Sequence, residues 1–558
     1  MKKLFFLLYF CFIHFSSAQF VGGSNKTFTR ADSLRGMLTP LRTCYDVTYY
    51  HLDITVDTTT QSIRGTNSIY FSVVEPFSTM QIDLFDTMKI EKIVYGKTEL
   101  QFKREFNAVF ITFPVALKKN STQSIVVHYS GTPIIAKRAP WDGGFVWTRN
   151  TTGALWIATA CQGIGASLWL PCKDHQSDKP DSVLLSVTVP KGLTDISNGR
   201  LRNKVDESKS STRFDWFVSY PINTYNISLN IGTFEHFDEQ YNNALTCDYY
   251  VQPYNLEKAR EQFKQVKPML RVFEKYFGAY PFYNDGYKLV ETPYLGMEHQ
   301  SAVAYGNGYV NGYKGASSSD VGLKFDFIII HESGHEWWGN SVTSKDIADM
   351  WIHEGICSYS EVVYLEELYG KKEALRYMNA QRWKVGNTAP IIGTYNVGNE
   401  GSPDMYNKGC LMLHTLRSVV DNDSLWFTLL RGIANDFKYT TTSTQEIVEY
   451  VYKKTEKDFS YFFRQYLNYP KLPQLHIVLR QKGNTLTMKY KWNTDVSEFA
   501  MPIKITTSTQ KFSFIIPTTS WQTMELKNIR PEEVMIDEEN FYVDVKKMIT
   551  YVDERVKE

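Results

Sequence analysis

Two histidines and a glutamate in the segment His331-Glu332-Ser333-Gly334-His335 could bind and use a metal ion. The histidines are four residues apart, so on a helix both imidazoles project from one face. A catalytic zinc ion usually has three protein ligands and one open position. Glu354, which follows His335 after 18 intervening residues, is the expected third ligand. Glu332 is the candidate catalytic base, although the pentapeptide alone also occurs in chains that bind no metal.

Two predicted helices must hold these residues. One, from about 322 to 338, carries both histidines, and a second, from Trp351 to Glu361, presents Glu354 to them. Glu361 lies two helical turns after Glu354, so it should share that face and could hold a zinc-binding imidazole through its second N–H group. His353 is interpreted as a neighbour rather than a fourth ligand, because a fourth protein ligand would close the site to water.

Hydrophobic patterning predicts a multidomain α+β fold. Alternation of apolar and polar residues, as in Tyr50 to Val56, predicts an N-terminal antiparallel β-domain over 19–250. Helical periodicity from Glu257 to Phe277, where Pro268 should kink or split the helix, opens a mixed α/β domain over 251–470 with an edge strand at 287–292. A proline-containing linker then leads to a small β-sandwich over 471–548 and a tail over 549–558.

The N-terminus predicts export. A basic start, Met1-Lys2-Lys3, precedes an apolar run from Leu4 to Phe15 and then small residues, which is the layout of a signal peptide over 1–18. We therefore expect a periplasmic or extracellular protein. No later apolar run reaches 18 residues, so no membrane span is predicted.

Charge and cysteine content exclude other classes of site. The chain has 61 Lys plus Arg and 60 Asp plus Glu, which gives no indication of a nucleic-acid partner. The six cysteines beyond the apolar leader show neither a disulfide framework nor CxxC spacing, so no disulfide and no cysteine zinc site is assigned. These are Cys44, Cys161, Cys172, Cys247, Cys357 and Cys410.

The segment from His331 to Thr343, taken together with Trp351-Ile352-His353-Glu354-Gly355, resembles the gluzincin zinc aminopeptidases, the family of aminopeptidase N and leukotriene hydrolase. That family has the same spacer and a W-x-x-E-G motif around its third ligand. The resemblance implies a thermolysin-like catalytic domain and one zinc ion per chain, bound by His331, His335 and Glu354. It also implies hydrolysis of the N-terminal peptide bond of peptides with a free amino terminus, with Glu332 as the base.

Three further matches imply residues that contact the substrate. Gly296-Met297-Glu298 occupies the place of the family motif G-x-M-E-N, in which Leu295 replaces the leading glycine and His299 the asparagine. By this resemblance Glu298 binds the substrate's α-ammonium group, beside Gly296 and Met297. Gln162, nine residues before Pro171, is implied as a second amine anchor, and Tyr406, in a Y-x-K-G segment, as the residue that stabilises the oxyanion.

Other functions remain open at this stage. The zinc motif would also suit a thermolysin-like endopeptidase, whereas the departures at Leu295 and His299 would suit a catalytically weak peptide-binding protein. A second hydrolase activity of the leukotriene-hydrolase kind is compatible with Gln162. Longer relatives carry a C-terminal helical domain over the active site. The sequence ends after the predicted β-sandwich, so we expect a short form with a more open cleft, as a monomer or a homodimer.

Overall fold

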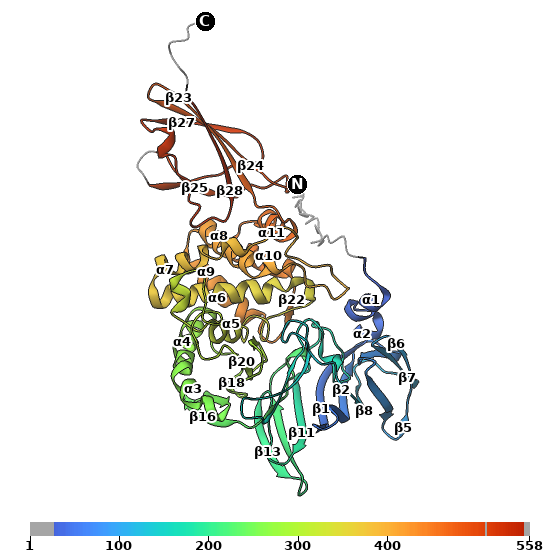
Figure 1. The fold of residues 1–558 in the computed structure, drawn as a ribbon. Coiled ribbons are helices and arrows are strands. Elements are labelled where there is room, and N and C mark those ends of the chain that lie inside the picture. The colour runs from blue at the N-terminus through green and yellow to red at the C-terminus, as the bar shows by residue number, and fades with distance from the viewer. Residues whose placement is uncertain (1–26, 508–510, 552–558) are drawn as a thin grey trace, which may run out of the picture.

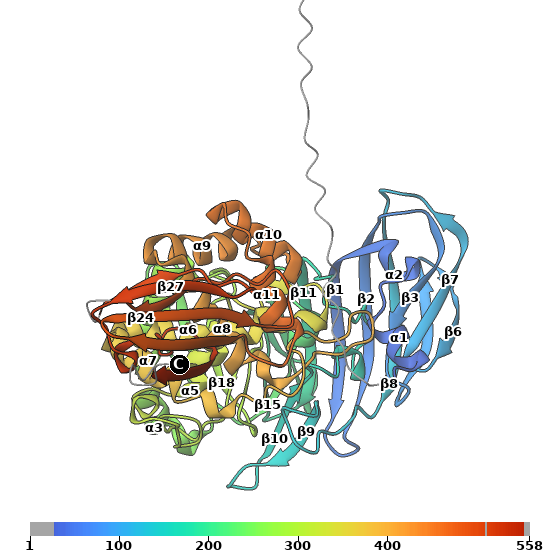
Figure 2. The same cartoon turned by 90° about the horizontal axis from the view of Figure 1, so that it is seen from above.

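The computed structural model describes residues 27–507 and 511–551, so the signal peptide expected at 1–18 lies outside the described residues. In Figure 1 the C-terminal strands lie above a central helical region, and the N-terminal sheet lies below and to the right of it. Figure 2, seen from above, shows the same N-terminal sheet to the right of the helical region. Among the described residues, no helix is both long and apolar enough to cross a membrane.

An eight-stranded sheet forms most of the N-terminal β-domain, as predicted from the alternating residues. In β1 the side chains of Leu52, Ile54 and Val56 are buried, while their neighbours face outward. The strands pair in the order β13-β14-β11-β1-β2-β8-β4-β5, and only the β1–β11 pair is parallel. Their bounds are β1 Tyr45–Asp57, β2 Ser62–Val73, β4 Met88–Tyr95, β5 Thr98–Glu99, β8 Thr122–Gly131, β11 Ser182–Pro190, β13 Arg200–Asp206 and β14 Ser211–Val218.

Two smaller sheets and two short helices complete this domain. The helices are α1, Arg30–Gly36, and α2, Pro40–Thr43. One sheet contains β3 Phe77–Asp83, β7 Ala108–Leu117 and β6 Gln101–Glu105 in the order β3-β7-β6. The other has the order β12-β15-β10-β9, with β12 Thr194–Ile196, β15 Asn230–Gly232, β10 Leu155–Ala160 and β9 Gly144–Arg149. Ala158 and Ala160 of β10 pack against Tyr294, Met297 and Ala304, so this sheet contacts the next domain behind the Met297-Glu298 pair.

A five-stranded mixed sheet, in the order β16-β17-β18-β20-β19, opens the mixed α/β domain. Its strands are β16 Glu235–Gln240, β17 Thr246–Val251, β18 Tyr287–Glu291, β20 Val303–Tyr305 and β19 Gly296–Met297. The boundary expected near residue 250 therefore falls inside this sheet. The predicted edge position of residues 287–292 is wrong, because β18 lies between β17 and β20. Its charged residues are buried with partners, since Lys288 donates to the carbonyl of Gly199, and Glu291 accepts from the backbone N–H of Gln252.

Nine helices of the described chain follow the first strands of this sheet. The bounds are α3 Leu256–Gln262, α4 Val266–Phe277, α5 Phe327–Gly334, α6 Trp351–Tyr369, α7 Lys371–Asn379, α8 Asn407–Val420, α9 Asp423–Asp436, α10 Thr444–Thr455 and α11 Ser460–Asn468. The split predicted around Pro268 is present, because a 3-10 turn at Phe263–Gln265 separates α3 from α4. Pro268 itself lies in the first turn of α4, where a backbone N–H would have no partner within the helix. A two-stranded pair, β21 Thr343–Ser344 and β22 Thr441–Thr442, joins the loop after α5 to the start of α10.

The region predicted to be a small β-sandwich contains two sheets in its described residues. A four-stranded sheet has the order β27-β24-β23-β28, and β25 pairs with β26. The bounds are β23 Gln474–Lys482, β24 Thr485–Asn493, β25 Ile503–Thr506, β26 Phe512–Ile515, β27 Gln522–Lys527 and β28 Asp544–Tyr551. Its apolar residues belong to the same buried cluster as the catalytic helices, and the Tyr466 hydroxyl of α11 donates to the carbonyl of Tyr542 at 2.7 Å. The two regions therefore share one core.

Candidate active site

Helix α5 carries both motif histidines. Its N-cap is Asp326, whose carboxylate accepts from the backbone N–H groups of Ile328 and Ile329 at 3.0 and 3.4 Å. The helix is shorter than predicted: residues 320–323 form a separate 3-10 turn, and α5 ends at Gly334 with His335 as its C-cap. After it the chain turns back, so that Asn340 N–H donates to the carbonyl of His335 at 2.9 Å. Ile328, Ile329 and Ile330, near the start of α5, are buried and hold His331 in the core of the domain.

Helix α6 brings Glu354 to the two histidines. Its Oε2 atom lies 3.4 Å from His331 Nε2 and 3.3 Å from His335 Nε2. Ligand atoms about 2.0–2.1 Å from a tetrahedral zinc ion would be about 3.3 Å apart. Glu354 Oε2 is also buried and has no hydrogen-bond partner among the described residues. Burying a carboxylate oxygen without a partner is energetically unfavourable, and a bound cation would remove that cost. The three side chains therefore fit a zinc ion.

The second nitrogen of each histidine is held by the protein. His331 Nδ1 lies 2.7 Å from Glu361 Oε1, and His335 Nδ1 lies 2.8 Å from the carbonyl oxygen of Trp338. Because both of these partners are acceptors, both Nδ1 atoms donate, and the Nε2 lone pairs face the proposed zinc position. Glu361 Oε2 in turn accepts from the Tyr377 hydroxyl at 2.5 Å. Tyr377 was not predicted, since no local pattern distinguishes it among 36 tyrosines.

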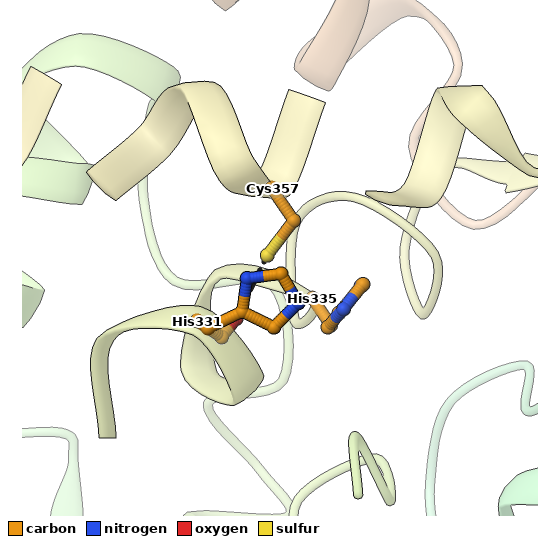
Figure 3. Close-up of side chains that lie close together, drawn as sticks. All are labelled: His331, His335 and Cys357. Atoms are coloured by element: carbon orange, nitrogen blue, oxygen red, sulfur yellow. Dashed lines mark hydrogen bonds between the residues drawn. The ribbon is translucent and has the colours of Figure 1, made fainter. Parts of the chain in front are cut away.

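Cys357 lies beside the histidines, although sequence spacing indicated no cysteine zinc site. Its sulfur and one ring nitrogen from each of His331 and His335 all lie within 4.8 Å of one another, and Figure 3 shows it pointing from α6 toward α5. The thiol donates to the carbonyl of His331 at 2.7 Å, and a Cβ added at Gly334 would approach the sulfur to 2.7 Å. The sulfur therefore packs against the backbone of α5. Burial raises the pKa of Cys357, which favours the neutral thiol over a zinc-binding thiolate.

Two other histidines, His299 and His353, lie next to predicted site residues in the sequence. His353 is buried, and its Nε2 accepts from the backbone N–H of Ser344 at 2.8 Å. The lone pair of that nitrogen is therefore not free to bind a metal ion. His299, where the family motif has asparagine, is fully buried, and neither of its ring nitrogens has a hydrogen-bond partner among the described residues. Burial lowers the pKa of His299 to about 3, so its ring is neutral. Neither histidine lies in the lining of the cleft described next.

A cleft of about 800 Å³ contains the histidines and glutamates and receives side chains from both domains. Gln162, from the loop after β10, donates through Nε2 to Glu298 Oε1 at 2.6 Å and to Glu354 Oε1 at 3.2 Å. The Tyr225 hydroxyl, which the sequence did not indicate, donates to Glu298 Oε1 at 3.2 Å. Gln162 thus connects the expected amine anchor directly to an expected zinc ligand.

Strand β19 packs tightly against the candidate base. A Cβ added at Gly296 would lie 2.9 Å from Glu332 Oε1 and 2.8 Å from a methyl carbon of Ile328, so only glycine fits there. Met297 is buried in the cluster that joins β10 to this strand, and it also lines the cleft. Burial raises the pKa of Glu332 to about 7, while the two neighbouring histidines lower it.

Tyr406 reaches the cleft from the start of α8. Its ring centroid lies 6.1 Å from that of His331 with an interplanar angle of 28°. Helix α8 packs closely on α6 through two glycines, since a Cβ added at Gly409 would lie 3.0 Å from the Cα of Gly355. The glycines of the W-x-x-E-G and Y-x-K-G segments therefore allow the two helix backbones to approach each other closely. Burial raises the pKa of Tyr406 well above its ordinary value, so the hydroxyl remains a hydrogen-bond donor.

Comparison with known proteins identifies both large domains. Residues 46–226 match the peptidase M1 N-terminal domain, and residues 261–466 match the peptidase family M1 domain. The chain is 23% identical over 441 residues to leukotriene A-4 hydrolase from Xenopus laevis, an alignment that spans 73% of this chain and 68% of that protein. It is 24% identical over 425 residues to a leucyl aminopeptidase from Saccharolobus solfataricus, spanning 72% of this chain and 51% of the relative.

Solved structures have the same fold. A mutant M1 zinc metallopeptidase from Deinococcus radiodurans, bound to a Tyr-Ser-Ala substrate, superimposes with a TM-score of 0.63 at 22% identity. The superposition covers 77% of this chain and 95% of that one.

Proposed function

The chain belongs to peptidase family M1, and we propose that it is a zinc-dependent aminopeptidase that hydrolyses the N-terminal peptide bond of peptides with a free amino terminus. One observation carries the proposal of an exopeptidase. The Glu298 carboxylate lies in the cleft and is joined through a single side chain, Gln162, to Glu354. An ammonium group bound at Glu298 would therefore sit close to the zinc ligands, which suits cleavage after the first residue.

His331, His335 and Glu354 would hold the zinc ion. Bound there, zinc would supply Lewis-acid polarisation of the scissile carbonyl and would acidify a water molecule for attack. Glu332 would take the proton from that water and then deliver it to the leaving nitrogen. Burial raises the pKa of Glu332, which favours proton uptake by this carboxylate.

The remaining side chains would orient the substrate and stabilise charge. Glu298 Oε1 already accepts from Gln162 and Tyr225, which leaves Oε2 for the substrate's ammonium group. The amide nitrogen of Gln162 faces the two carboxylates, so its carbonyl oxygen is available as a second acceptor for the same group. Tyr406 would donate to the oxyanion that develops on the scissile carbonyl, an interaction that can contribute a few kcal/mol to the transition state.

A panel of aminoacyl fluorogenic substrates tests this function. The purified protein should release the fluorophore from unblocked aminoacyl substrates, lose that activity in a chelator, and regain it when zinc is added back. Cleavage of blocked internal peptides would instead favour an endopeptidase. Zinc binding without any turnover would favour the peptide-binding alternative.

The proposal extends to export and domain limits. Residues 1–18 would be a signal peptide, supported by the basic start and the apolar run, so that the mature protein acts in the periplasm or outside the cell. Domain limits of 19–250, 251–470 and 471–548 are proposed from the sequence, with β16 and β17 contributing to the catalytic sheet. N-terminal sequencing of the exported protein should give a first residue near Gln19. Light scattering would distinguish a monomer from a homodimer.

A further inference from the structure

A wall of aromatic side chains extends from the zinc-binding histidines to the mouth of the cleft. The Phe327 ring stacks on the His331 ring at 5.1 Å and 14°, and the Tyr313 ring meets Phe327 edge-on at 5.6 Å. The ammonium group of Lys314, the next residue, lies 5.7 Å from the centre of the Trp141 ring. Because Trp141 comes from the N-terminal domain, the Lys314 contact joins the two domains at the cleft.

The outer members of this wall are accessible to a ligand. Tyr313 is 42% exposed and Trp141 is 60% exposed, and both line the same cleft as His331. Single exposed aromatic residues are common on protein surfaces and need no explanation. Two that line one cleft, together with the partly buried Phe327 ring that stacks on a proposed zinc ligand, offer aromatic surface to a bound molecule.

The proposed chemistry indicates which part of a substrate would reach this wall. Glu332 delivers its proton to the leaving nitrogen, so the residue after the scissile bond must lie beside Glu332. Phe327 and Ile328 precede Glu332 by about one turn of α5, and both line the cleft. Tyr313 is near the same carboxylate: burial, and then the charge of Glu332, raise the pKa of Tyr313. Gln162, one of the two proposed amine anchors, instead contacts Glu354.

We propose that Phe327, Tyr313 and Trp141 form the subsite for the residue that follows the scissile bond, and that the protein favours peptides with an aromatic or large aliphatic second residue. The inference rests on the proposed aminopeptidase function. It adds the class of side chain that the protein prefers at the first residue of the leaving peptide. An aromatic ring in this subsite would pack edge-on or offset against Tyr313 and Trp141, which is the preferred geometry of aromatic pairs.

Two dipeptide amides that differ only in the second residue test the subsite. Alanine release from Ala-Phe-NH2 and Ala-Gly-NH2 is measured by chromatography, and the unaltered protein should favour Ala-Phe-NH2 by about tenfold or more in kcat/KM. Tyr313→Ala and Trp141→Ala should each lower this ratio through a higher KM for Ala-Phe-NH2. Tyr313→Phe, which keeps the ring, should preserve it. The matched controls Tyr254→Ala and Trp521→Ala remove aromatic residues of similar exposure outside the cleft, and should also leave it unchanged.

The ratio separates the possible outcomes. It does not depend on the amount of folded enzyme, so partial misfolding of a variant lowers both rates and leaves the ratio as it was. A ratio near one in the unaltered protein overturns the inference while leaving the aminopeptidase function intact. A high ratio that persists in the Tyr313→Ala, Trp141→Ala double variant also overturns it. Failure of the unaltered protein to release alanine from either amide, together with failure on the whole aminoacyl panel, would refute the proposed function itself, and the subsite with it.

Discussion

Replacement of Glu361 by alanine should weaken zinc binding although Glu361 is not a proposed ligand. Its two oxygens hold His331 Nδ1 at 2.7 Å and the Tyr377 hydroxyl at 2.5 Å, which fixes both the position and the tautomer of the imidazole. Loss of a carboxylate that orients a zinc-binding histidine typically lowers metal affinity by about 10- to 100-fold, or about 1.4–2.8 kcal/mol. We expect an increase of this size in the zinc dissociation constant of Glu361→Ala.

Competition with a fluorescent chelator measures this effect. Tyr377→Phe removes only the hydroxyl that holds Glu361, and should raise the dissociation constant in the same direction by a smaller factor. Glu367→Gln is a matched control on the same helix, because its carboxylate pairs with Lys275 at the surface. Zinc affinity that is unchanged in Glu361→Ala would refute the argument that this carboxylate orients His331.

Three further substitutions test the remaining roles. Glu332→Gln should lower turnover by about 10²- to 10⁴-fold while metal analysis still finds one zinc per chain; loss of the metal would assign Glu332 to zinc binding instead. Tyr406→Phe should lower kcat by about 10²- to 10³-fold with little change in KM, and a rise in KM alone would contradict oxyanion stabilisation. Cys357→Ala should keep both zinc and most activity, since its sulfur faces the backbone of α5, whereas loss of zinc would identify the thiol as a ligand.

Sequence spacing was sufficient to predict contacts within one helix or between two neighbouring helices of the site. The four-residue interval of His331 and His335 and the seven-residue interval of Glu354 and Glu361 follow from helical geometry. The structure indeed brings Glu354 within 3.4 Å of both imidazoles and Glu361 within 2.7 Å of one. The length of α5 was overestimated, because apolar residues continue on both sides of it although the backbone turns at 320–323 and again after Gly334.

Contacts between distant segments could not be derived from spacing. Gln162 and Glu298 are 136 residues apart and come from different domains, so only the resemblance to known aminopeptidases indicated that they act together. Tyr225 and Tyr377 had no such motif and were missed. The buried position of β18 could not be predicted from the sequence either. Lys288 and Glu291 are residue types typical of exposed strands, and their hydrogen-bond partners come from distant segments.

The most direct test compares cleavage of a short peptide with cleavage of its N-acetylated twin by the zinc-loaded protein. It asks whether Glu298 directs a zinc site to the amino end of a peptide. Acetylation removes the charge that the Glu298 carboxylate would bind. Loss of one partner of a buried charged pair costs about 2 kcal/mol or more, which is about 30-fold in rate. We therefore predict release of the first residue from the free peptide and cleavage of the acetylated twin at least about 30-fold more slowly. Comparable rates on the two peptides would show that Glu298 does not select a free amino terminus.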